Sequence, residues 1–491
     1  MRFVARPRLP ARLVVAVVAA LALLTTIPAA ANVALTRIST DPTSNTTSQH
    51  ATQVEPDTYA FGNTIVSAFQ TGRFFDGGAS GIAFATSTNA GSTWTTGVLP
   101  GITRVQTGTT GPYDRVSDPA VAFDAQDNVW MVSSLAILAN PVRGVAVITS
   151  RSTNGGLTWG NPVTTATGSN LDKNWIACDN TSASPFFGNC YSEFDDTNNG
   201  NRIKMSTSTN GGLNWGAALN TGDNATGLGG QPVVRPNGTV LVPIANANET
   251  QIRSFRSING GTSWRATVLV SNVTAHTVAG SLRSGPLPSA EIDSAGTAYV
   301  VWQDCRFRSG CPANDIVMSK STSETTWGAV TRVPIDATNS GRDHFIPGIG
   351  VDRTTSGGSA RIGLTYYFYP VANCTAANCQ LDVGYVSSTN GGSTWSAATM
   401  VTGPMTLSWL ANTSQGRMVG DYISTSVFPA ANGGRAYPVI AVANAPSGSV
   451  FDEAMYVPTG GLAVSGGSLR ASSVGARRVP VSSRGGAGRR R

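Results

Sequence analysis

The feature that most constrains this chain is an eight-residue turn sequence that recurs along most of its length. Its clearest copy, Ser-Thr-Asn-Gly-Gly-Leu-Thr-Trp, occupies residues 152–159. Successive copies begin 49 to 67 residues apart. Self-similarity at such a period indicates repeated supersecondary units, each of which buries its apolar face only against its neighbours. The other copies are two close ones at 208–215 and 388–395, two looser ones at 87–94 and 257–264, and a shorter remnant at 321–327.

Each copy has the chemistry of a β-hairpin turn. Asn-Gly is the strongest short-range hairpin signal, because both residues accept positive φ values that match the twist of the flanking strands. Ser and Asn side chains can hydrogen-bond the local backbone and fix the turn. The closing Trp is large and mostly apolar, so we expect it to pack between neighbouring sheets.

The repeat resembles the Asp-box, or bacterial neuraminidase repeat, of sialidases and related β-propellers, which reads Ser-x-Asp-x-Gly-x-Thr-Trp. Here Asn stands at the Asp position of every full copy, for example Asn154 and Asn210. The resemblance implies a propeller of the sialidase superfamily. In that family the boxes are structural, so we expect the repeated turns themselves to carry no reaction.

A hairpin precedes each copy and completes the unit. Residues 120–133 are an example, because two apolar runs flank an Asp/Asn turn. With the strands on either side of the repeated turn, each unit has four antiparallel strands, as a propeller blade does. We therefore predict an all-β fold, a β-propeller of four-stranded antiparallel blades. We expect seven blades, with six as the alternative because sialidases have six, and we expect residues 33–38 to complete the last blade.

The ends of the chain differ in composition from the repeated region. Residues 1–31 have a basic start, an apolar core and a small-residue cleavage site, which is the pattern of a secretory signal peptide. Their apolar run is short for a membrane span, so we expect secretion without stable membrane insertion. The propeller is predicted over residues 32–458. Residues 459–491 are rich in Gly, Ser and Arg, and we expect them to form a disordered tail.

The net charge and the cysteine content of the chain restrict which ligands and cross-links are expected. The formal net charge of +7 comes from the arginines of the two ends, and the chain between them carries −4, so nucleic-acid binding is not expected. Six cysteines suit disulfide bonds in an exported protein. They lack the paired clusters of a zinc site, so we predict no metal and no cofactor. Of the 15 pairings possible for six cysteines, the spacing suggests the local ones, Cys178–Cys190, Cys305–Cys311 and Cys374–Cys379.

Strand order predicts where a ligand would bind. If the repeated turn joins the third and fourth strands of a blade, the loops that lead into each first strand lie on the opposite face. The loops between second and third strands lie there too. These loops hold much of the chain's unusual chemistry, and loops around the central opening of a propeller are where a pocket is expected.

The candidate site residues come from these loops. In the sialidase family, three arginines bind the substrate carboxylate, a Tyr paired with a Glu is the nucleophile, and an Asp is the general acid and base. The chain has no Phe/Tyr-Arg-Ile-Pro motif, so the resemblance assigns no residue directly. As catalytic candidates we name Asp118, Asp343, His344, Asp421 and Tyr422. As substrate-binding candidates we name Arg73, Arg115, Asp304, Arg306, Arg342, Tyr366 and Arg417.

Structural roles compete with these assignments. Asp304 and Arg306 could brace a disulfide loop as an ion pair. Asp118 could cap a turn, and Asp421 could hold the last blade to the first. The acidic run 193–196 could bind calcium through its oxygens, although it lacks the EF-hand spacing.

The function predicted from these observations is a secreted, monomeric, sialidase-like glycoside hydrolase that acts on an acidic or complex glycan. Two alternatives stay open. The propeller could bind an extracellular glycan or protein without catalysis, or it could be a polysaccharide lyase, for which His344 offers a base. Three converging arginines beside a Tyr–Glu contact would favour the hydrolase, and arginines dispersed in separate ion pairs would favour the binding protein.

Overall fold

The computed structural model describes residues 32–473. The predicted signal peptide and residues 474–491 of the predicted tail lie outside this range. Within it, strands and loops dominate, and the helices are four short 3-10 turns of three residues each: η1 (Thr197–Asn199), η2 (Gly357–Ser359), η3 (Leu407–Trp409) and η4 (Ala430–Asn432). The all-β prediction is confirmed. None of the described helices is long and apolar enough to cross a membrane.

The strands pair as antiparallel groups that follow one another along the chain, and we number these groups as blades. Blade 1 contains β2 (Gln49–Phe61), β3 (Thr64–Arg73), β4 (Ala79–Ser87) and β5 (Thr95–Val98). Blade 2 contains β6 (Arg115–Asp124), β7 (Val129–Ala139), β8 (Val142–Ser152) and the first half of β9 (Val163–Cys178). Blade 3 contains the second half of β9, β10 (Cys190–Asp196), β11 (Arg202–Ser208) and β12 (Leu219–Asn220).

The remaining groups repeat this order. Blade 4 contains β14 (Val233–Val234), β15 (Val240–Asn246), β16 (Gln251–Ser257) and β17 (Val268–Asn272), with β13 (Gly227–Leu228) also on β15. Blade 5 contains β18 (Ser289–Ile292), β19 (Ala298–Asp304), β20 (Asp315–Ser321) and β21 (Thr331–Arg332). Blade 6 contains β22 (His344–Val351), β23 (Ile362–Phe368), β24 (Gln380–Ser388) and β26 (Thr399–Thr406). Blade 7 contains β29 (Ser424–Val427), β30 (Arg435–Ser447), β31 (Val450–Pro458) and β1 (Leu35–Arg37).

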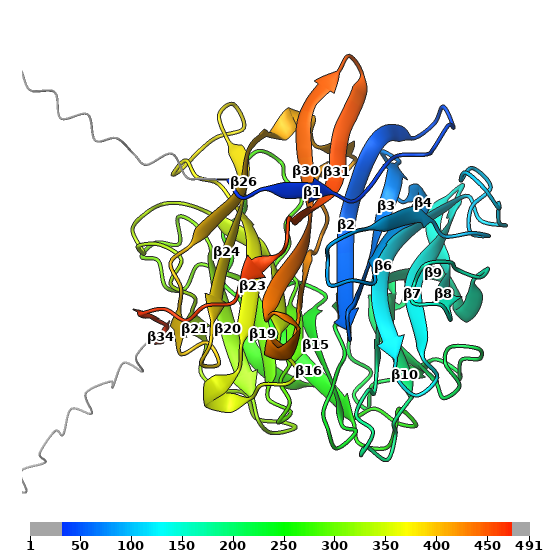
Figure 1. Ribbon diagram of the computed structural model, residues 1–491, viewed down its shortest axis with the longest axis horizontal. Helices are drawn as coiled ribbons and strands as arrows, with labels where there is room; N and C mark the ends of the chain where they lie inside the picture. Colours follow the sequence, from blue (N-terminus) through cyan, green and yellow to red (C-terminus); the bar gives the residue numbers. More distant parts are fainter. Residues whose placement is uncertain (1–31, 474–491) are drawn as a thin grey trace, which may run out of the picture. The chain divides into compact units, whose positions relative to one another are not determined.

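The N-terminal strand completes the last blade, as predicted. β1 pairs antiparallel with β31, with Thr36 opposite Val457. Figure 1 shows this contact as the blue β1 beside the orange β31. Because β1 covers the outer edge of β31, it shields backbone groups that would otherwise template pairing with another chain.

The repeated turn joins the third and fourth strands of a blade, as the strand-order argument required. In blade 2 the Ser152 hydroxyl accepts a hydrogen bond from the backbone N–H of Gly156 at 3.0 Å, and Asn154 Oδ1 accepts one from Thr158 N–H at 3.0 Å. All five full copies make the same two bonds. The prediction that Ser and Asn fix the turn is confirmed.

The same turn docks each blade on the one before it. Gly156 has a φ of +78°, and a Cβ there would lie 2.6 Å from Cγ2 of Val66 in blade 1. Glycine is therefore required both for the left-handed backbone and for the close approach. In blade 6 the closing Trp395 is fully buried and packs in one apolar cluster with Met318 of blade 5. Packing of the Trp between neighbouring sheets is thus observed for this copy.

The first strands of the blades face a common interior. A cavity of about 550 Å³ on the face of the repeated turns is lined from β2, β6, β9, β14, β18, β22 and β29. This arrangement is that of a propeller, in which the innermost strand of each blade surrounds a central channel.

The covalent cross-links are the three predicted ones, Cys178–Cys190, Cys305–Cys311 and Cys374–Cys379. The predicted boundary of the disordered tail is wrong for residues 459–473. These residues form β32 (Leu462–Ala463), β33 (Leu469–Arg470) and β34 (Ser472–Ser473), which pair with β30, β25 (Thr394–Trp395) and β21. The extended backbone of these residues forms hydrogen bonds with strands of blades 5 to 7. The composition of the segment did not indicate this pairing.

Candidate functional site

A cavity of about 1070 Å³ lies on the face opposite the repeated turns. Its lining comes from the starts of the first strands, the ends of the second strands and the loops that connect them. This is the face on which the sequence placed a pocket.

Backbone bulges aim three charged side chains at this cavity. Glu55 on β2, Asp118 on β6 and Lys173 on β9 have φ values of +57°, +48° and +52°. The ladders shift register around Glu55 and Asp118. A bulge re-aims a side chain and terminates regular pairing, and left-handed backbone in residues other than glycine concentrates at functional sites. Three neighbouring blades thus each present one ionisable group at the same place.

Asp421 is the fixed anion of the site. Its carboxylate accepts hydrogen bonds from Lys173 Nζ and from the Arg283 guanidinium, whose Nε lies 3.1 Å from Oδ1. Burial alone would raise the pKa of Asp421, but Lys173 and Arg283 outweigh it and hold the pKa below the usual range. Asp421 therefore stays charged. In addition, its backbone N–H donates a hydrogen bond to Glu55 at 3.2 Å, and this bond ties blade 7 to blade 1.

Asp118 is a buried carboxyl that lines the cavity. It is 3% exposed, and its carboxylate makes no hydrogen bond with any residue in 32–473. Burial raises its pKa to about 6, with the negative charge of Asp172 adding to the effect and Lys173 opposing it. Glu55 is also buried, and burial with the charges of Asp118 and Asp421 raises its pKa to about 7. The pKa values of Asp118 and Glu55 are thus raised in the same cavity in which that of Asp421 is lowered, and carboxyls whose pKa values are pushed apart are typical of catalytic sites.

Two further groups line the cavity from blades 4 and 5. Glu249 lies in the β15–β16 turn with a φ of +54°, and burial raises its pKa. His276 follows β17, and its Nδ1 lies 2.8 Å from Asp343 Oδ2. Asn314 holds this pair, because its backbone N–H donates to Asp343 at 2.7 Å and its side-chain oxygen accepts from His276 N–H at 2.7 Å. The side chain of His276 is 33% exposed.

The predicted arginines do not converge. Of the five, Arg73 alone lines the cavity among the described residues. Arg115 pairs with Asp76 at 2.5 Å, Arg306 pairs with Asp304 at 2.6 Å, and Arg417 donates to the backbone oxygen of Leu410 at 3.0 Å. Arg342 is exposed. A guanidinium that holds an internal partner is not free to bind a substrate carboxylate.

The predicted aromatic and imidazole groups belong to the core. Tyr422 donates its hydroxyl to Pro119 O at 3.0 Å, and burial raises its pKa well above 10. Tyr366 is 1% exposed and contacts His344 edge-on. Burial lowers the pKa of His344 to about 4, so this ring is neutral.

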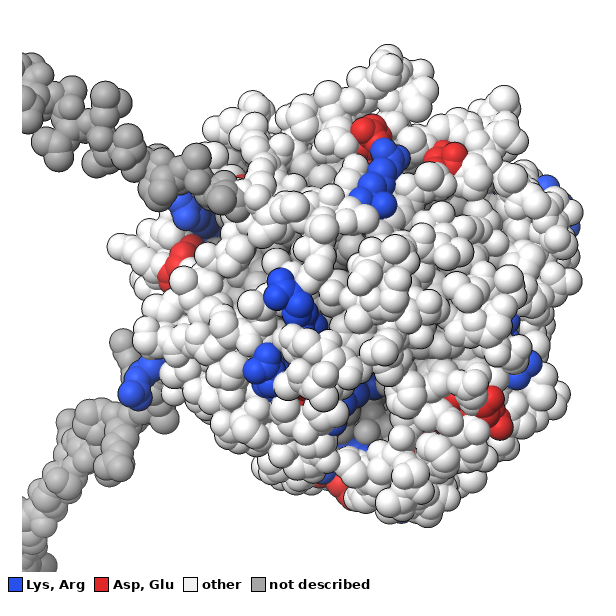
Figure 2. Space-filling view, viewed as in Figure 1, with Lys and Arg blue, Asp and Glu red and all other residues white. Residues whose placement is uncertain are grey.

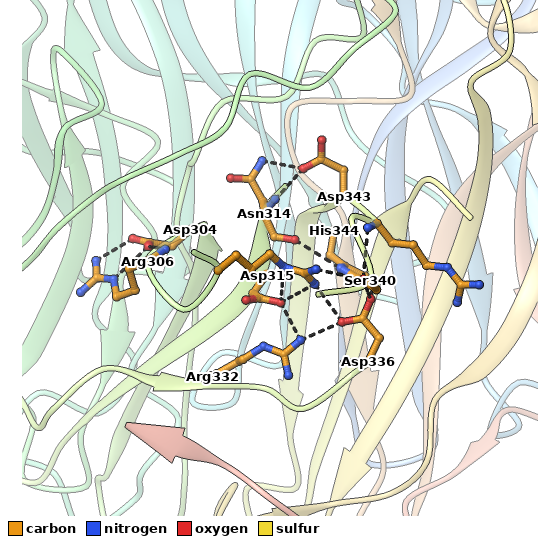
Figure 3. A network of polar contacts seen from close by, with 11 residues as sticks. Asp304, Arg306, Asn314, Asp315, Arg332, Asp336, Ser340, Asp343 and His344 are labelled. Carbon is orange, nitrogen blue, oxygen red and sulfur yellow. Dashed lines mark hydrogen bonds and ion pairs between the residues drawn. The ribbon is translucent and has the colours of Figure 1, made fainter. Parts of the chain in front are cut away.

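The polar cluster near blade 5 is an ion-pair network, drawn in Figure 3. Asp304 and Arg306 face each other at its edge, and Asn314 points to Asp343. Asp315, Asp336 and His344 lie close enough to hold a metal ion. However, Arg308 and Arg332 each pair with both carboxylates at 2.6 to 2.8 Å. Cations of the protein thus already occupy the position that a metal ion would need, so the cluster is structural.

Seven ionisable residues that line this cavity were not among the candidates named from the sequence. The signal for one of them was present, because Glu55 and Asp118 both directly precede the proline that opens a first strand. Lys173 holds the same position in β9, where Asn174 replaces the proline. The other groups come from irregular loops and have no such marker. The seven residues are Glu55, Arg143, Asp172, Lys173, Glu249, His276 and Arg283.

Comparison with known proteins supports the fold. No protein-family model and no curated protein matches the chain. Among solved structures, an ulvan lyase of polysaccharide lyase family PL25 matches with a TM-score of 0.50 at 10% identity, covering 90% of this chain and 98% of that one. The Hadza microbial sialidase Hz136 matches with a TM-score of 0.43 at 12% identity over 87% of this chain and 68% of that one. The NanB sialidase of Streptococcus pneumoniae matches with a TM-score of 0.42 at 12% identity over 86% and 70%. At these identities the likeness concerns the architecture, which the ulvan lyase shares, and the chain is an all-β propeller of antiparallel blades.

Proposed function

We propose that this protein is a secreted glycoside hydrolase that binds a glycan in the cavity of about 1070 Å³. The observation that carries the proposal is the set of carboxyls in that cavity. Asp118 has a raised pKa and no hydrogen-bond partner in 32–473, while Asp421 is held charged by two cations. The ulvan lyase that shares the fold acts on a polysaccharide, and three disulfides suit an extracellular protein, which supports a glycan as the ligand.

Asp118 acts as the general acid in this proposal. Its proton passes to the glycosidic oxygen as the bond from that oxygen to the anomeric carbon breaks. Asp172, on the next first strand, supplies the second carboxylate, which either takes a proton from an attacking water or attacks the anomeric carbon itself. Asp421, Lys173 and Arg283 act as positioning residues, because their ion pairs fix the strands that present Asp118 and Asp172.

The sialidase form of this hypothesis has less support. It needs three arginines around a substrate carboxylate and an accessible Tyr–Glu pair. Here the arginines are dispersed in separate contacts and Tyr422 is buried. We therefore propose carboxyl-based hydrolysis rather than a tyrosine nucleophile.

A second candidate is a polysaccharide lyase, and one observation favours it. His276 lines the cavity, and its bond to Asp343 fixes the ring with Nε2 available as a base. A lyase removes the proton beside a uronate carboxylate, and an Asp-oriented histidine can do so. His276 replaces His344 as the base that this alternative requires.

One experiment separates these functions. The secreted protein is incubated with a panel of neutral and acidic polysaccharides, and products are followed by reducing ends and by the ultraviolet absorbance of an unsaturated sugar. Hydrolysis predicts reducing ends without absorbance, and a loss of about 100- to 10,000-fold for Asp118→Asn. Asp452→Asn, at an exposed ion pair, is the control and keeps full activity. Absorbance lost in His276→Gln would establish the lyase, and binding without products would establish the non-catalytic propeller.

A further inference from the structure

The cavity of about 550 Å³ on the face of the repeated turns has no part in the proposed reaction. No residue in 32–473 lines both this cavity and the one that holds Asp118. Tyr422 of blade 7 lies between them, because its hydroxyl donates to Pro119 O of blade 2 at 3.0 Å and its ring packs edge-on against Trp175 of blade 3. These contacts join blades that are not neighbours, so they cross the central channel. The second cavity is therefore a separate site, and its volume lies in the range of small-molecule sites.

Two buried side chains of this second cavity each keep one polar atom without a partner. Asp57 on β2 is 3% exposed; its Oδ2 accepts Val121 N–H at 2.7 Å, and its Oδ1 has no hydrogen-bond partner in residues 32–473. Gln231, just before β14, is 6% exposed; its Oε1 accepts Ala290 N–H at 2.9 Å, and its Nε2 has no partner in the same range. Buried polar atoms of proteins are paired with protein, water or a ligand, so these two atoms mark where a ligand can be held.

Asp57 is also the acid of this lining that the protein leaves without a charged or multiple partner. Arg353 pairs with Glu291 at 2.9 Å and lies over the ring of Tyr59, 4.5 Å from its centroid. Asp293 accepts hydrogen bonds from three backbone N–H groups. Asp57 forms no ion pair with any residue in 32–473.

Burial raises the pKa of Asp57 to about 7, and the charge of Glu291 adds to the effect. The carboxyl is therefore partly protonated at neutral pH when no ligand is bound. A cation beside it favours the charged form, because opposite charges stabilise each other in a buried site. An anion would instead be repelled by Glu291 and, above pH 7, by the Asp57 carboxylate.

The rest of the wall suits an organic body. Tyr59, Phe61, Trp175 and Phe428 line the cavity together with aliphatic side chains such as Val233. Aromatic rings attract cations through their negative faces, as Tyr59 does with Arg353. A bare metal ion is not favoured, because no three metal-binding side chains of the described lining lie close enough to share one.

We propose that this second cavity binds a small organic cation, an ammonium group on an apolar body, with its charge at the Asp57 carboxylate and a hydroxyl or carbonyl oxygen accepting from Gln231 Nε2. This site is independent of the hydrolase, because the two cavities share no lining residue in 32–473. On the face drawn in Figure 2, the described Lys, Arg, Asp and Glu side chains are scattered and form no large patch of one sign. A charged molecule that binds specifically is thus expected inside a cavity and not on that face.

The test measures binding of three molecules of similar shape to the full secreted chain at about pH 8, where Asp57 is mostly ionised and an aliphatic ammonium keeps its proton. Phenylalaninol carries the ammonium, phenylpropanediol has a neutral hydroxyl in its place, and phenyllactate carries a carboxylate. Titration calorimetry is expected to show phenylalaninol binding about ten-fold or more tightly than the other two. Asp57→Asn keeps an acceptor for Val121 N–H and is expected to abolish this preference while leaving the affinity for the diol unchanged.

Ser182 offers a second variant outside the core, because it lines the cavity from an exposed position. Ser182→Arg adds a positive charge there and is expected to weaken phenylalaninol binding about three-fold. Ser182→Gln is the matched neutral control and is expected to bind phenylalaninol as the unaltered protein does.

The outcomes also separate this site from the hydrolase. Asp118→Asn should leave phenylalaninol binding unchanged, whether or not it abolishes hydrolysis. Equal affinity for the three molecules, or no binding of phenylalaninol at up to about 10 mM, overturns the proposal. Binding that Asp118→Asn weakens and Asp57→Asn leaves intact overturns it as well, because the cation then lies in the other cavity.

Discussion

Glu193 gives the sharpest test of how charge is distributed inside this propeller. It lies on β10, is fully buried, and neither of its carboxylate oxygens has a hydrogen-bond partner in residues 32–473. A Cβ on Gly230 of blade 4 would lie 2.6 Å from its carboxyl carbon, so the group is sealed between blades 3 and 4. Burial, with Asp195 adding to it, raises the pKa of Glu193 well above 4.5.

The sign of the pH dependence follows from this raised pKa. Above pH 4.5 the unfolded chain loses the Glu193 proton while the folded chain keeps it, so the free energy of unfolding falls as the pH rises. Each pH unit in this window removes roughly 1.4 kcal/mol. Between the unfolded and the folded pKa of Glu193, the cost to the folded state should therefore grow by about this amount with each pH unit. Glu193→Gln has nearly the same shape and does not titrate, so it should abolish this part of the slope.

The assay is urea unfolding of the two proteins at intervals from pH 4 to 8. We expect the difference in unfolding free energy to grow in favour of Glu193→Gln as the pH rises. Asp452→Asn, at an exposed ion pair, should leave the slope unchanged. Parallel curves for the unaltered protein and Glu193→Gln across this range would refute the reasoning.

Three further predictions concern the site and the repeated turns. The specificity constant for hydrolysis should fall as the pH rises through about 6, because Asp118 must carry its proton, and a rate that stays level to pH 8 would contradict this assignment. Trp395→Ala should lower the free energy of unfolding by about 3 to 5 kcal/mol because the ring is fully buried, and a loss below about 1 kcal/mol in urea would be the opposite result. Gly156→Ala should destabilise the protein by about 1 to 3 kcal/mol, since it strains a φ of +78° and clashes with blade 1. In Gly160→Ala the added Cβ would contact only the backbone oxygen of Arg151, at 3.8 Å, so this variant should unfold at the same urea concentration as the unaltered protein.

The architecture was readable because its signals are local. The turn at 152–159 carries its own hydrogen-bonding groups, and these make the same bonds in the structure that their chemistry suggests. Repetition then fixes the place of each turn between third and fourth strands. The closure of blade 7 by β1 followed from the need to cover a strand edge. The order of residues 459–473 did not follow, because an extended Gly/Ser segment has the same composition whether or not an edge is available to it.

The site was only partly readable because its chemistry depends on partners far apart in the chain. Asp421 and Asp118 were recognised as unusual acids, but their roles depend on Lys173 and Arg283, which contact Asp421 from other blades. The sequence left two roles open for Arg306, an ion pair with Asp304 and a contact with substrate, and the structure shows the ion pair. Loop residues such as His276 gain meaning only from tertiary contacts.

The most direct test of the account is a crystal structure of Asp118→Asn soaked with an oligosaccharide that the unaltered protein cleaves. The account predicts an intact sugar in the cavity on the face opposite the repeated turns, with its glycosidic oxygen within hydrogen-bond distance of residue 118. A sugar bound on the face of the repeated turns, or in the cavity but away from residue 118, would contradict it.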